Sequence, residues 1–460
     1  MEDAVHLARS RYLITSDRTY RRPDGTPVRL GYLSRRARFF SIDAADCDRL
    51  ERGDIEAIAA GTLRELERLG AVVDASTDEL GEVLDVFRAG SDSVRHRRFT
   101  IMPTAYCNMG CSYCGQVHFK SRLAADRAER LTARVEAAMA AEGTEVVSVS
   151  WFGGEPLLGY RLITESSRRF LARSRATGVR YYARMATNGS LLTTRKLAQL
   201  HDDCGLREMD VTIDGPREVH DRRRVLKNGS TSFDRCVGVL SETAARGLAP
   251  ELRITVRVNV DTGNEAQVPR LLQDLAAAGF GTPQFSLQFM PVHSWGNDIS
   301  SVEIGARKYA EQEAGWLRSA QQLGLRFLPL PTATRATTCI ATTRSGEVHD
   351  PGGKVYSCSE HPLVPGAQDS EVIARTEDLV GAGPRPSGRF DDWYDQVANP
   401  SQPCHRCPFL PICGGSCPKL WREGHVPCPS YKFNVQDRMD IAATSRMGCE
   451  PPEVAGRADA

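Results

Sequence analysis

Three cysteines within eight residues constrain this chain more than any other feature of its sequence. Cys107, Cys111 and Cys114 form the pattern CxxxCxxC directly after the apolar segment 99–103, which is typical of a buried strand. Structural zinc sites and ordinary iron–sulfur sites close their coordination with four protein ligands. Three thiols after a strand therefore predict a cluster with one iron open to a ligand that the protein does not supply. A zinc knuckle or three buried thiols are the alternatives.

Cysteine content and charge narrow the class of protein further. The 460 residues hold 14 cysteines, too dilute for a disulfide scaffold, and most stand in close groups, which favours metal or cluster ligation in a reducing compartment. With 59 basic and 58 acidic residues, the net charge of +1 gives no reason to expect nucleic acid or a membrane surface as a partner. Met1-Glu2-Asp3 is acidic, and no run approaches the roughly 18 apolar residues of a membrane span. We therefore expect a cytoplasmic protein without a signal peptide.

The middle of the chain alternates strand-like and helix-like segments. In the last-but-one helical segment, for example, Leu271, Leu272 and Leu275 recur at helical spacing. Such alternation predicts a parallel sheet curled into a partial barrel of about six βα units, with ligands at the C-terminal ends of the strands. Strands are expected at 99–103, 146–152, 179–186, 209–213, 252–260 and 284–290, and helices at 124–141, 162–176, 194–201, 233–246, 268–278 and 306–323.

A smaller β-then-α unit precedes the barrel. Leu63, Leu66 and Leu69 fall at helical spacing before Gly70, and the polar segment 74–98 predicts a linker. Strands are expected at 12–15, 28–33 and 37–42 around the turn Pro23-Asp24-Gly25, and 71–73 is expected to return to their sheet.

A glycine-rich segment ends the second predicted strand of the barrel. Gly153-Gly154-Glu155-Pro156 combines two glycines, which let the backbone approach a ligand closely, with a carboxylate that can receive an ammonium group. With this GGEP segment one βα unit after CxxxCxxC, and with Tyr113 before the last cysteine, the chain resembles the radical S-adenosylmethionine (SAM) enzymes. The resemblance implies that Cys107, Cys111 and Cys114 bind a 4Fe–4S cluster, whose open iron is chelated by SAM. It also implies SAM contacts from Gly153, Gly154, Glu155, Pro156, Asn188, Thr212 and Asn259.

Seven more cysteines follow the barrel with the spacing C-x13-G-x4-C, then C-x2-C-x5-C-x3-C, then C. This order resembles the SPASM domain, which binds two auxiliary 4Fe–4S clusters; two zinc ribbons are the alternative. The resemblance implies that one cluster is bound by Cys404, Cys407, Cys413 and Cys428, and that Cys339, Cys358 and Cys417 contribute to the other. Some relatives have an eighth cysteine where this chain has Ser345, so the first auxiliary cluster either has an open iron or takes a ligand from Cys47, Cys204, Cys236 or Cys449.

The resemblance predicts an α/β fold with a partial (β/α)6 TIM-like radical SAM barrel. Residues 1–95 form the N-terminal module and linker, 96–325 the barrel, 326–440 the SPASM domain with two auxiliary clusters, and 441–460 a flexible tail. The module is similar in layout to the winged-helix, leader-peptide-binding modules of peptide-modifying radical SAM enzymes. An extension that packs on the barrel is the alternative.

The resemblance also implies an activity. With SAM and three 4Fe–4S clusters, the enzyme would cleave SAM reductively to a 5′-deoxyadenosyl radical and abstract hydrogen from a ribosomally made precursor peptide that carries a leader. The product would contain an oxidative C–C, C–O or thioether crosslink, and the electron donor would be a protein such as flavodoxin or ferredoxin.

Two other functions compete with this one. An anaerobic sulfatase-maturating enzyme would form formylglycine, but such enzymes use an aspartate directly after the second SPASM cysteine and lack a long N-terminal extension. Here Ser359 follows Cys358, so both differences favour the crosslinking maturase. The second alternative is a non-catalytic interaction protein that binds zinc or a cluster and forms no 5′-deoxyadenosine.

Overall fold

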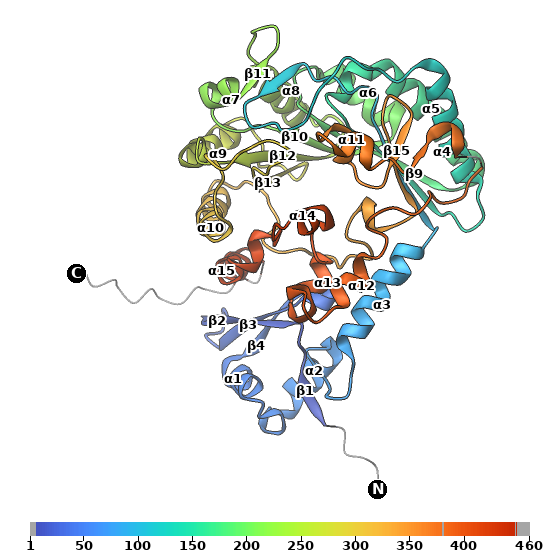
Figure 1. Cartoon of the computed structure of the whole chain (residues 1–460). Coiled ribbons are helices and arrows are strands. Elements are labelled where there is room, and N and C mark those ends of the chain that lie inside the picture. The colour runs from blue at the N-terminus through green and yellow to red at the C-terminus, as the bar shows by residue number, and fades with distance from the viewer. Residues whose placement is uncertain (1–5, 380, 447, 449–460) are drawn as a thin grey trace.

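A sheet of nine strands runs through the computed structural model, which describes residues 6–379, 381–446 and 448 (Figure 1). Six of the strands are parallel neighbours in the order β6-β8-β9-β10-β12-β13. Each is joined to the next through at least one helix, which confirms the predicted partial barrel. The six are β6 His96–Ile101, β8 Val146–Trp151, β9 Arg180–Thr187, β10 Leu206–Thr212, β12 Arg253–Val260 and β13 Phe285–Pro291.

The two faces of these six strands differ in burial. Val147, Val149 and Met185 belong to the main hydrophobic core. On the other face, Arg184 and Arg257 keep part of their surface exposed. The sheet is therefore sealed by helices on its outer side and presents polar side chains on its inner side, where the C-terminal segment lies (Figure 1). The helices of the barrel are α4 Ala125–Ala140, α5 Tyr160–Thr177, α6 Thr194–Cys204, α7 Arg217–Arg223, α8 Phe233–Arg246, α9 Val268–Ala277 and α10 Ala306–Gln322, with the short turns η3 Pro156–Gly159 and η4 Glu265–Gln267.

The C-terminal segment contributes strands to the barrel sheet, which the sequence did not predict. β14 Gly346–His349 lies parallel to β6, and β15 Lys354–Tyr356 and β16 Ala374–Arg375 continue the sheet as antiparallel strands. The remaining elements are η5 Ile340–Thr342, η6 His361–Leu363, α11 Ala367–Ser370, η7 Thr376–Asp378, α12 Trp393–Ala398, η8 Pro403–Arg406, α13 Leu410–Cys413, α14 Pro418–Arg422, η9 Ser430–Lys432 and α15 Val435–Arg446.

A buried charge cluster explains how a strand with a charged centre enters the core. Glu347 of β14 accepts hydrogen bonds from Arg97 Nη2 (2.9 Å) and from Arg134 Nη2 and Nε (2.7 and 3.1 Å), and His349 Nε2 lies 3.1 Å from its other oxygen. Because Arg97 lies on β6 and Arg134 on α4, this Glu347 cluster ties the C-terminal segment to the barrel. All of these side chains are buried.

The N-terminal module contains the predicted antiparallel sheet, in the order β2-β3-β4. The predicted helix before Gly70 is also present, and Gly70 ends it with a left-handed φ of 78°. The segment 71–73 does not return to this sheet, because β5 pairs with β1 in a separate ribbon. The elements are β1 Leu7–Arg9, β2 Leu13–Arg21, β3 Pro27–Leu33, η1 Ser34–Arg36, β4 Arg38–Asp43, α1 Ala44–Arg52, η2 Ile55–Ala57, α2 Ala60–Leu69, β5 Val72–Asp74 and α3 Glu79–Asp92.

The predicted linker is wrong over most of its length, because α3 fills it. This helix buries Leu80, Val83, Leu84 and Phe87 beneath a charged outer surface. Phe87 stacks on Tyr394 of the C-terminal segment, with ring centroids 5.0 Å apart. The many charged residues of 74–98 obscured this apolar stripe in the sequence.

The module packs on the C-terminal segment (Figure 1), which the alternative of an extension on the barrel did not anticipate. Tyr20, Leu30 and Tyr32 share a core with Phe409 and Ile412. Tyr32 also donates a hydrogen bond to the Pro331 carbonyl at 2.7 Å. The loop that carries Cys404, Cys407 and Cys413 therefore rests directly on the N-terminal sheet.

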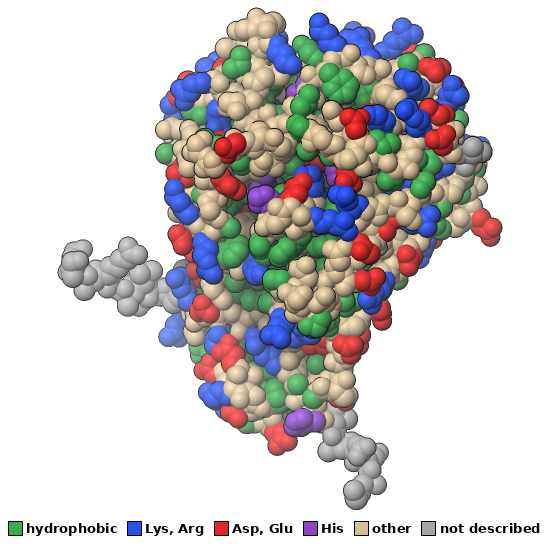
Figure 2. Space-filling model, viewed as in Figure 1, with side chains coloured by type: hydrophobic (Ala, Val, Ile, Leu, Met, Phe, Trp, Pro, Cys, Tyr) green, Lys and Arg blue, Asp and Glu red, His purple; other side chains and the backbone are tan. Residues whose placement is uncertain are grey.

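The predicted tail at 441–460 begins too early. α15 continues to Arg446, and Ile441, Ala442 and Ala443 are buried against neighbouring elements. Residues 447 and 449–460, including Cys449, lie outside the described residues. Within the described residues, no helix is both long and apolar enough to cross a membrane. Acidic and basic side chains are interspersed over the visible face (Figure 2), in keeping with the near-zero net charge.

Candidate active site

The loop of Cys107, Cys111 and Cys114 follows β6 and is held against the far half of the barrel. β7 Met109–Cys111 pairs with β11 Arg224–Leu226, which places Cys111 opposite Arg224. Burial raises the pKa of all three thiols, and the charge of Cys111 adds to this effect at the other two. The three side chains therefore lie close together, in the sheltered surroundings that a cluster of soft ligands requires.

The GGEP segment packs against the same loop through its backbone. Gly154 N donates to Thr104 O (3.3 Å), and Glu155 N donates to Tyr106 O (3.0 Å). A Cβ atom on Gly154 would lie 2.3 Å from Tyr106 O, and Gly153 has a left-handed φ of 126°. Both glycines are required by the close approach of the two loops.

Replacing Gly154 by alanine is expected to displace the cysteine loop and to lower 5′-deoxyadenosine formation at least tenfold. The added methyl group meets backbone atoms of Tyr106 and Cys107, which cannot move aside independently. Gly110→Ala is the matched control, because a Cβ at Gly110 meets nothing within 4 Å. Product formation by the reconstituted variants checks this, and equal activity in both would contradict it.

Glu155 is fully buried and already has hydrogen-bond donors on both carboxylate oxygens. Its Oε1 accepts from Leu157 N (2.9 Å) and Thr187 Oγ1 (2.8 Å), and its Oε2 accepts from Asn188 N (2.8 Å). Burial raises the pKa of Glu155, while these donors act in the opposite direction. The carboxylate thus braces the GGEP segment against the end of β9, and its predicted contact with SAM stays a prediction. Pro156 follows as the first residue of η3.

The other predicted SAM contacts lie at neighbouring strand ends. Asn188 Nδ2 donates to Asn108 Oδ1 at 2.8 Å and lies 3.7 Å from Cys107 Sγ. Thr212 ends β10, and Asn259 on β12 donates to the Tyr113 hydroxyl at 3.0 Å. The structure therefore brings two of these three residues into contact with the cysteine loop.

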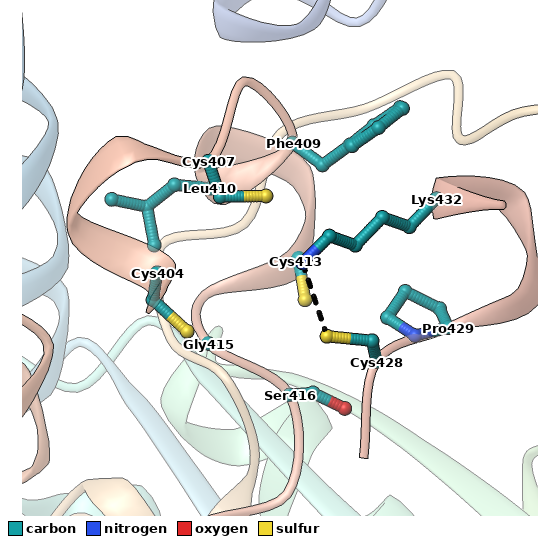
Figure 3. Close-up of a pocket in the computed structure, with 10 residues that line it drawn as sticks. All are labelled: Cys404, Cys407, Phe409, Leu410, Cys413, Gly415, Ser416, Cys428, Pro429 and Lys432. Carbon is teal, nitrogen blue, oxygen red and sulfur yellow. Dashed lines mark hydrogen bonds between the residues drawn. The ribbon is translucent and has the colours of Figure 1, made fainter. Parts of the chain in front are cut away.

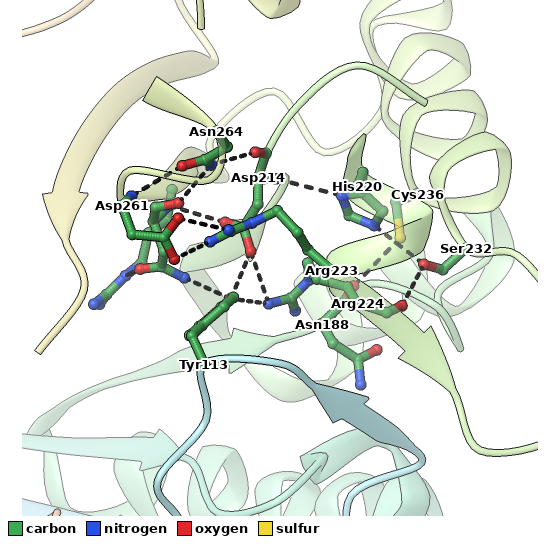
Figure 4. Close-up of polar contacts among 12 residues, drawn as sticks. Tyr113, Asn188, Asp214, His220, Arg223, Arg224, Ser232, Cys236, Asp261 and Asn264 are labelled. Carbon is green, nitrogen blue, oxygen red and sulfur yellow. Dashed lines mark hydrogen bonds and ion pairs between the residues drawn. The ribbon is translucent and has the colours of Figure 1, made fainter. Parts of the chain in front are cut away.

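A buried polar network that the sequence did not predict surrounds Tyr113 (Figure 4). The Tyr113 hydroxyl donates to Asp214 Oδ2 (2.5 Å) and accepts from Arg224 Nη1 (2.6 Å). Burial raises the pKa of Tyr113 well above its usual value, so the phenol keeps the proton that it donates. Asp214 directly follows the strand predicted at 209–213, and Arg224 lies ten residues later in the chain.

A buried ion pair between an arginine and an aspartate extends the network around Tyr113. Arg223 and Asp261 form a bidentate ion pair (2.7 and 2.9 Å), and Asn264 Nδ2 donates to the Asp214 carbonyl at 2.6 Å. An acidic residue after each of two neighbouring strands, with the adjacent pair Arg223 and Arg224 between them in the chain, was the available signal.

Two further groups of thiols lie in the C-terminal segment. Cys404, Cys407, Cys413 and Cys428 line one pocket together with Lys432 (Figure 3). Cys339, Cys358 and Cys417 form the other group: burial raises the pKa of Cys358, and the charges of Cys339 and Cys417 raise it further. Among the described residues, no three Cys, His, Asp or Glu side chains are placed to hold a single metal ion. The binding of clusters by these thiols stays a prediction.

Among the residues that the structure describes, the predicted sources of a missing ligand have other surroundings than the three-thiol group. Ser345 donates its hydroxyl to the Ser93 carbonyl at 2.7 Å. Cys47 lies near Arg29 and Glu51 in the N-terminal module, Cys204 is buried at the end of α6, and Cys236 donates to the Asn188 carbonyl at 3.3 Å. Cys449 is outside the described residues.

Comparison with known proteins shows what part of this chain is similar to. Residues 101–248 match the family model of the Radical SAM superfamily. The Fe-coproporphyrin III synthase of Methanosarcina barkeri is 29% identical over 192 residues, which span 39% of this chain and 44% of the synthase, less than half of that relative. A serine-type anaerobic sulfatase-maturating enzyme of Bacteroides thetaiotaomicron is 23% identical over 355 residues, 68% of this chain and 80% of that enzyme.

A solved structure, native anSMEcpe with bound AdoMet and Cp18Cys peptide, shares the fold with a TM-score of 0.57. The two chains are 15% identical, over 76% of this chain and 97% of that one.

Proposed function

Because the chain is an enzyme of the radical SAM superfamily, we propose that it matures a ribosomally made precursor peptide by installing an oxidative crosslink. A direct contact between the segments that follow Cys114 and Cys358 carries this proposal. Gln116 Nε2 donates to Glu360 Oε2 (3.2 Å), and Val117 N donates to Leu363 O (2.8 Å). These contacts join the segment after Cys114 to the segment after Cys358, which supports a reaction that passes an electron from substrate to an auxiliary cluster.

Each group of residues has its own part in the proposed reaction. The thiols of Cys107, Cys111 and Cys114 would hold a 4Fe–4S cluster, and the other seven would hold two auxiliary clusters. When bound, the cluster and SAM supply a radical able to abstract hydrogen from an unactivated carbon. The GGEP segment and Asn188 orient the cofactors, and the Tyr113 network holds the cysteine loop closed against the strand ends. A protein such as flavodoxin or ferredoxin would supply the electrons.

The N-terminal module is proposed to bind the leader of the peptide. β4 is one of the two edge strands of its sheet, so its outer edge can pair with an extended segment. Beside it, a groove between β4 and α2 is lined by apolar and charged side chains: Arg22, Phe40, Ser41, Ile42, Asp43, Thr62, Glu65, Leu66 and Leu69. A leader that adds a strand to β4 would place its side chains in this groove.

Replacing Glu65 by tryptophan is expected to weaken leader binding at least tenfold, because the indole fills the groove. Glu67→Trp is the matched control, since Glu67 is an exposed residue of the same helix that does not line the groove. Fluorescence anisotropy provides the measurement, with a labelled candidate precursor peptide taken from the small open reading frames found by sequencing around this gene. Equal affinity in the two variants would argue against this location.

The proposed activity is tested with the anaerobically reconstituted enzyme, SAM, a reductant and the same peptide. We expect 5′-deoxyadenosine and a peptide lighter by two hydrogen atoms that resists sequencing across the linked residues. The sulfatase-maturating alternative, favoured by the 23% identical relative, predicts instead an aldehyde that reacts with a hydrazide probe. Absence of 5′-deoxyadenosine would remove the proposal altogether.

A further inference from the structure

One cation lies among the four thiols of the pocket in Figure 3. Lys432 Nζ donates to Cys428 Sγ at 3.4 Å, and its side chain lines the pocket beside Cys404, Cys407 and Cys413. Among the described residues, no carboxylate forms an ion pair with this ammonium group. The recorded side-chain hydrogen bond of this ammonium group is therefore the one to a cysteine sulfur.

The backbone holds Lys432 in this position. It ends η9, where Lys432 N donates to Pro429 O at 3.0 Å and Phe433 N donates to Ser430 O at 2.8 Å. The neighbouring Tyr431 ring packs on Phe409 with centroids 5.4 Å apart. The direction of the lysine is thus set by its turn and by packing, and a cluster bound to the thiols would find the ammonium group already in place.

We propose that Lys432 raises the reduction potential of the cluster bound by these four thiols, which makes that cluster an electron acceptor in the reaction. The inference rests on the proposed auxiliary cluster. Reduction adds one negative charge to the cluster, and a hydrogen-bonded cation stabilises the more negative state. In this proposal Lys432 acts on the reaction only through the cluster that it tunes.

The test is an EPR-monitored redox titration of the reconstituted chain in which Cys107, Cys111 and Cys114 are replaced by alanine, so that only auxiliary clusters contribute. The signal of this site is the one lost when Cys404 and Cys407 are also replaced. Lys432→Gln is compared with Lys432→Arg, which keeps the charge. Lys308→Gln is the control, because Lys308 lies more than 100 residues before Lys432 and forms an ion pair with Glu265 instead of contacting a thiol.

We expect Lys432→Gln to lower the reduced-to-oxidised ratio at a fixed potential at least tenfold, which is about 59 mV for a one-electron couple. Lys432→Arg should restore most of the difference, and Lys308→Gln should have no effect. An unchanged potential in Lys432→Gln, with the signal intact, would overturn the role of the lysine. Absence of any signal that depends on Cys404 and Cys407 would instead overturn the proposed cluster.

Discussion

Replacing Cys107, Cys111 and Cys114 together by alanine is expected to abolish 5′-deoxyadenosine formation and to remove about four iron atoms per chain. The loss should reach roughly three orders of magnitude, or more than about 4 kcal/mol in the activation barrier, because no other group can deliver the electron to SAM. The auxiliary thiols lie in separate parts of the chain, so their iron should remain. Product analysis and iron determination on anaerobically reconstituted protein provide the measurements.

Cys236→Ala is the matched control for this result. Cys236 is buried and donates to the Asn188 carbonyl, so it lies near the same loop without belonging to the group of three. Its replacement should leave iron content unchanged and activity within a few-fold of the parent enzyme. A triple variant that keeps both its iron and its activity would contradict the assignment of the three thiols.

Replacing Glu347 by alanine is expected to lower the free energy of unfolding by about 3–5 kcal/mol, the cost of leaving a buried charge without its partner. Arg97 and Arg134 would both lose the carboxylate that they share, in a place that water does not reach. Glu145→Ala is the control, because Glu145 pairs with Arg95 at 2.7 Å on the surface, where such a pair contributes at most about 1 kcal/mol. Urea unfolding followed by circular dichroism compares the two variants.

The Glu347 cluster also predicts how the free energy of unfolding lost in Glu347→Ala depends on pH. Burial opposes ionisation of Glu347, but hydrogen bonds from His349 and Arg134 outweigh it and lower its pKa from 4.5 to about 2. A carboxylate with a depressed pKa in the folded state stabilises the protein fully above the unfolded pKa. The stability that depends on this depressed pKa should therefore be complete above pH 4.5 and disappear as the pH falls toward 2. If the difference in free energy of unfolding between the parent and Glu347→Ala stayed constant from pH 4.5 to pH 2, the assignment would be contradicted.

Local patterns in the chain were sufficient to predict the barrel. Strands such as β12 consist of alternating β-branched residues, and helices such as α9 carry a regular leucine stripe, so neighbours in the sequence carry the whole signal. The structure gathers four of the seven later cysteines around one pocket and brings Cys339 and Cys417 near Cys358, and the clusters that the SPASM resemblance implied for them stay a prediction.

Features that depend on distant partners were missed. β14 has a glutamate and a histidine among its four residues and becomes a strand because Arg97 and Arg134, more than 200 residues earlier, neutralise its charge. The Tyr113 network likewise joins Tyr113, Asp214 and Arg224 from three separate segments, none of which is distinctive alone. Lys432 lies four residues after Cys428, yet only the folded turn shows that it faces the thiols.

The parallel pairing of β14 with β6 also determines how this protein can be divided for expression. A fragment that ends with the barrel helices would expose the whole edge of β6, with its unpaired backbone groups and the apolar Phe99 and Ile101. Such an open edge recruits strands from other molecules and leads to aggregation. A fragment that begins after the barrel would leave β14 without β6, the strand with which it pairs. Soluble pieces of this enzyme should therefore be sought only with the barrel and the C-terminal strands kept in one polypeptide, or supplied together so that the edge is covered as the fragments fold.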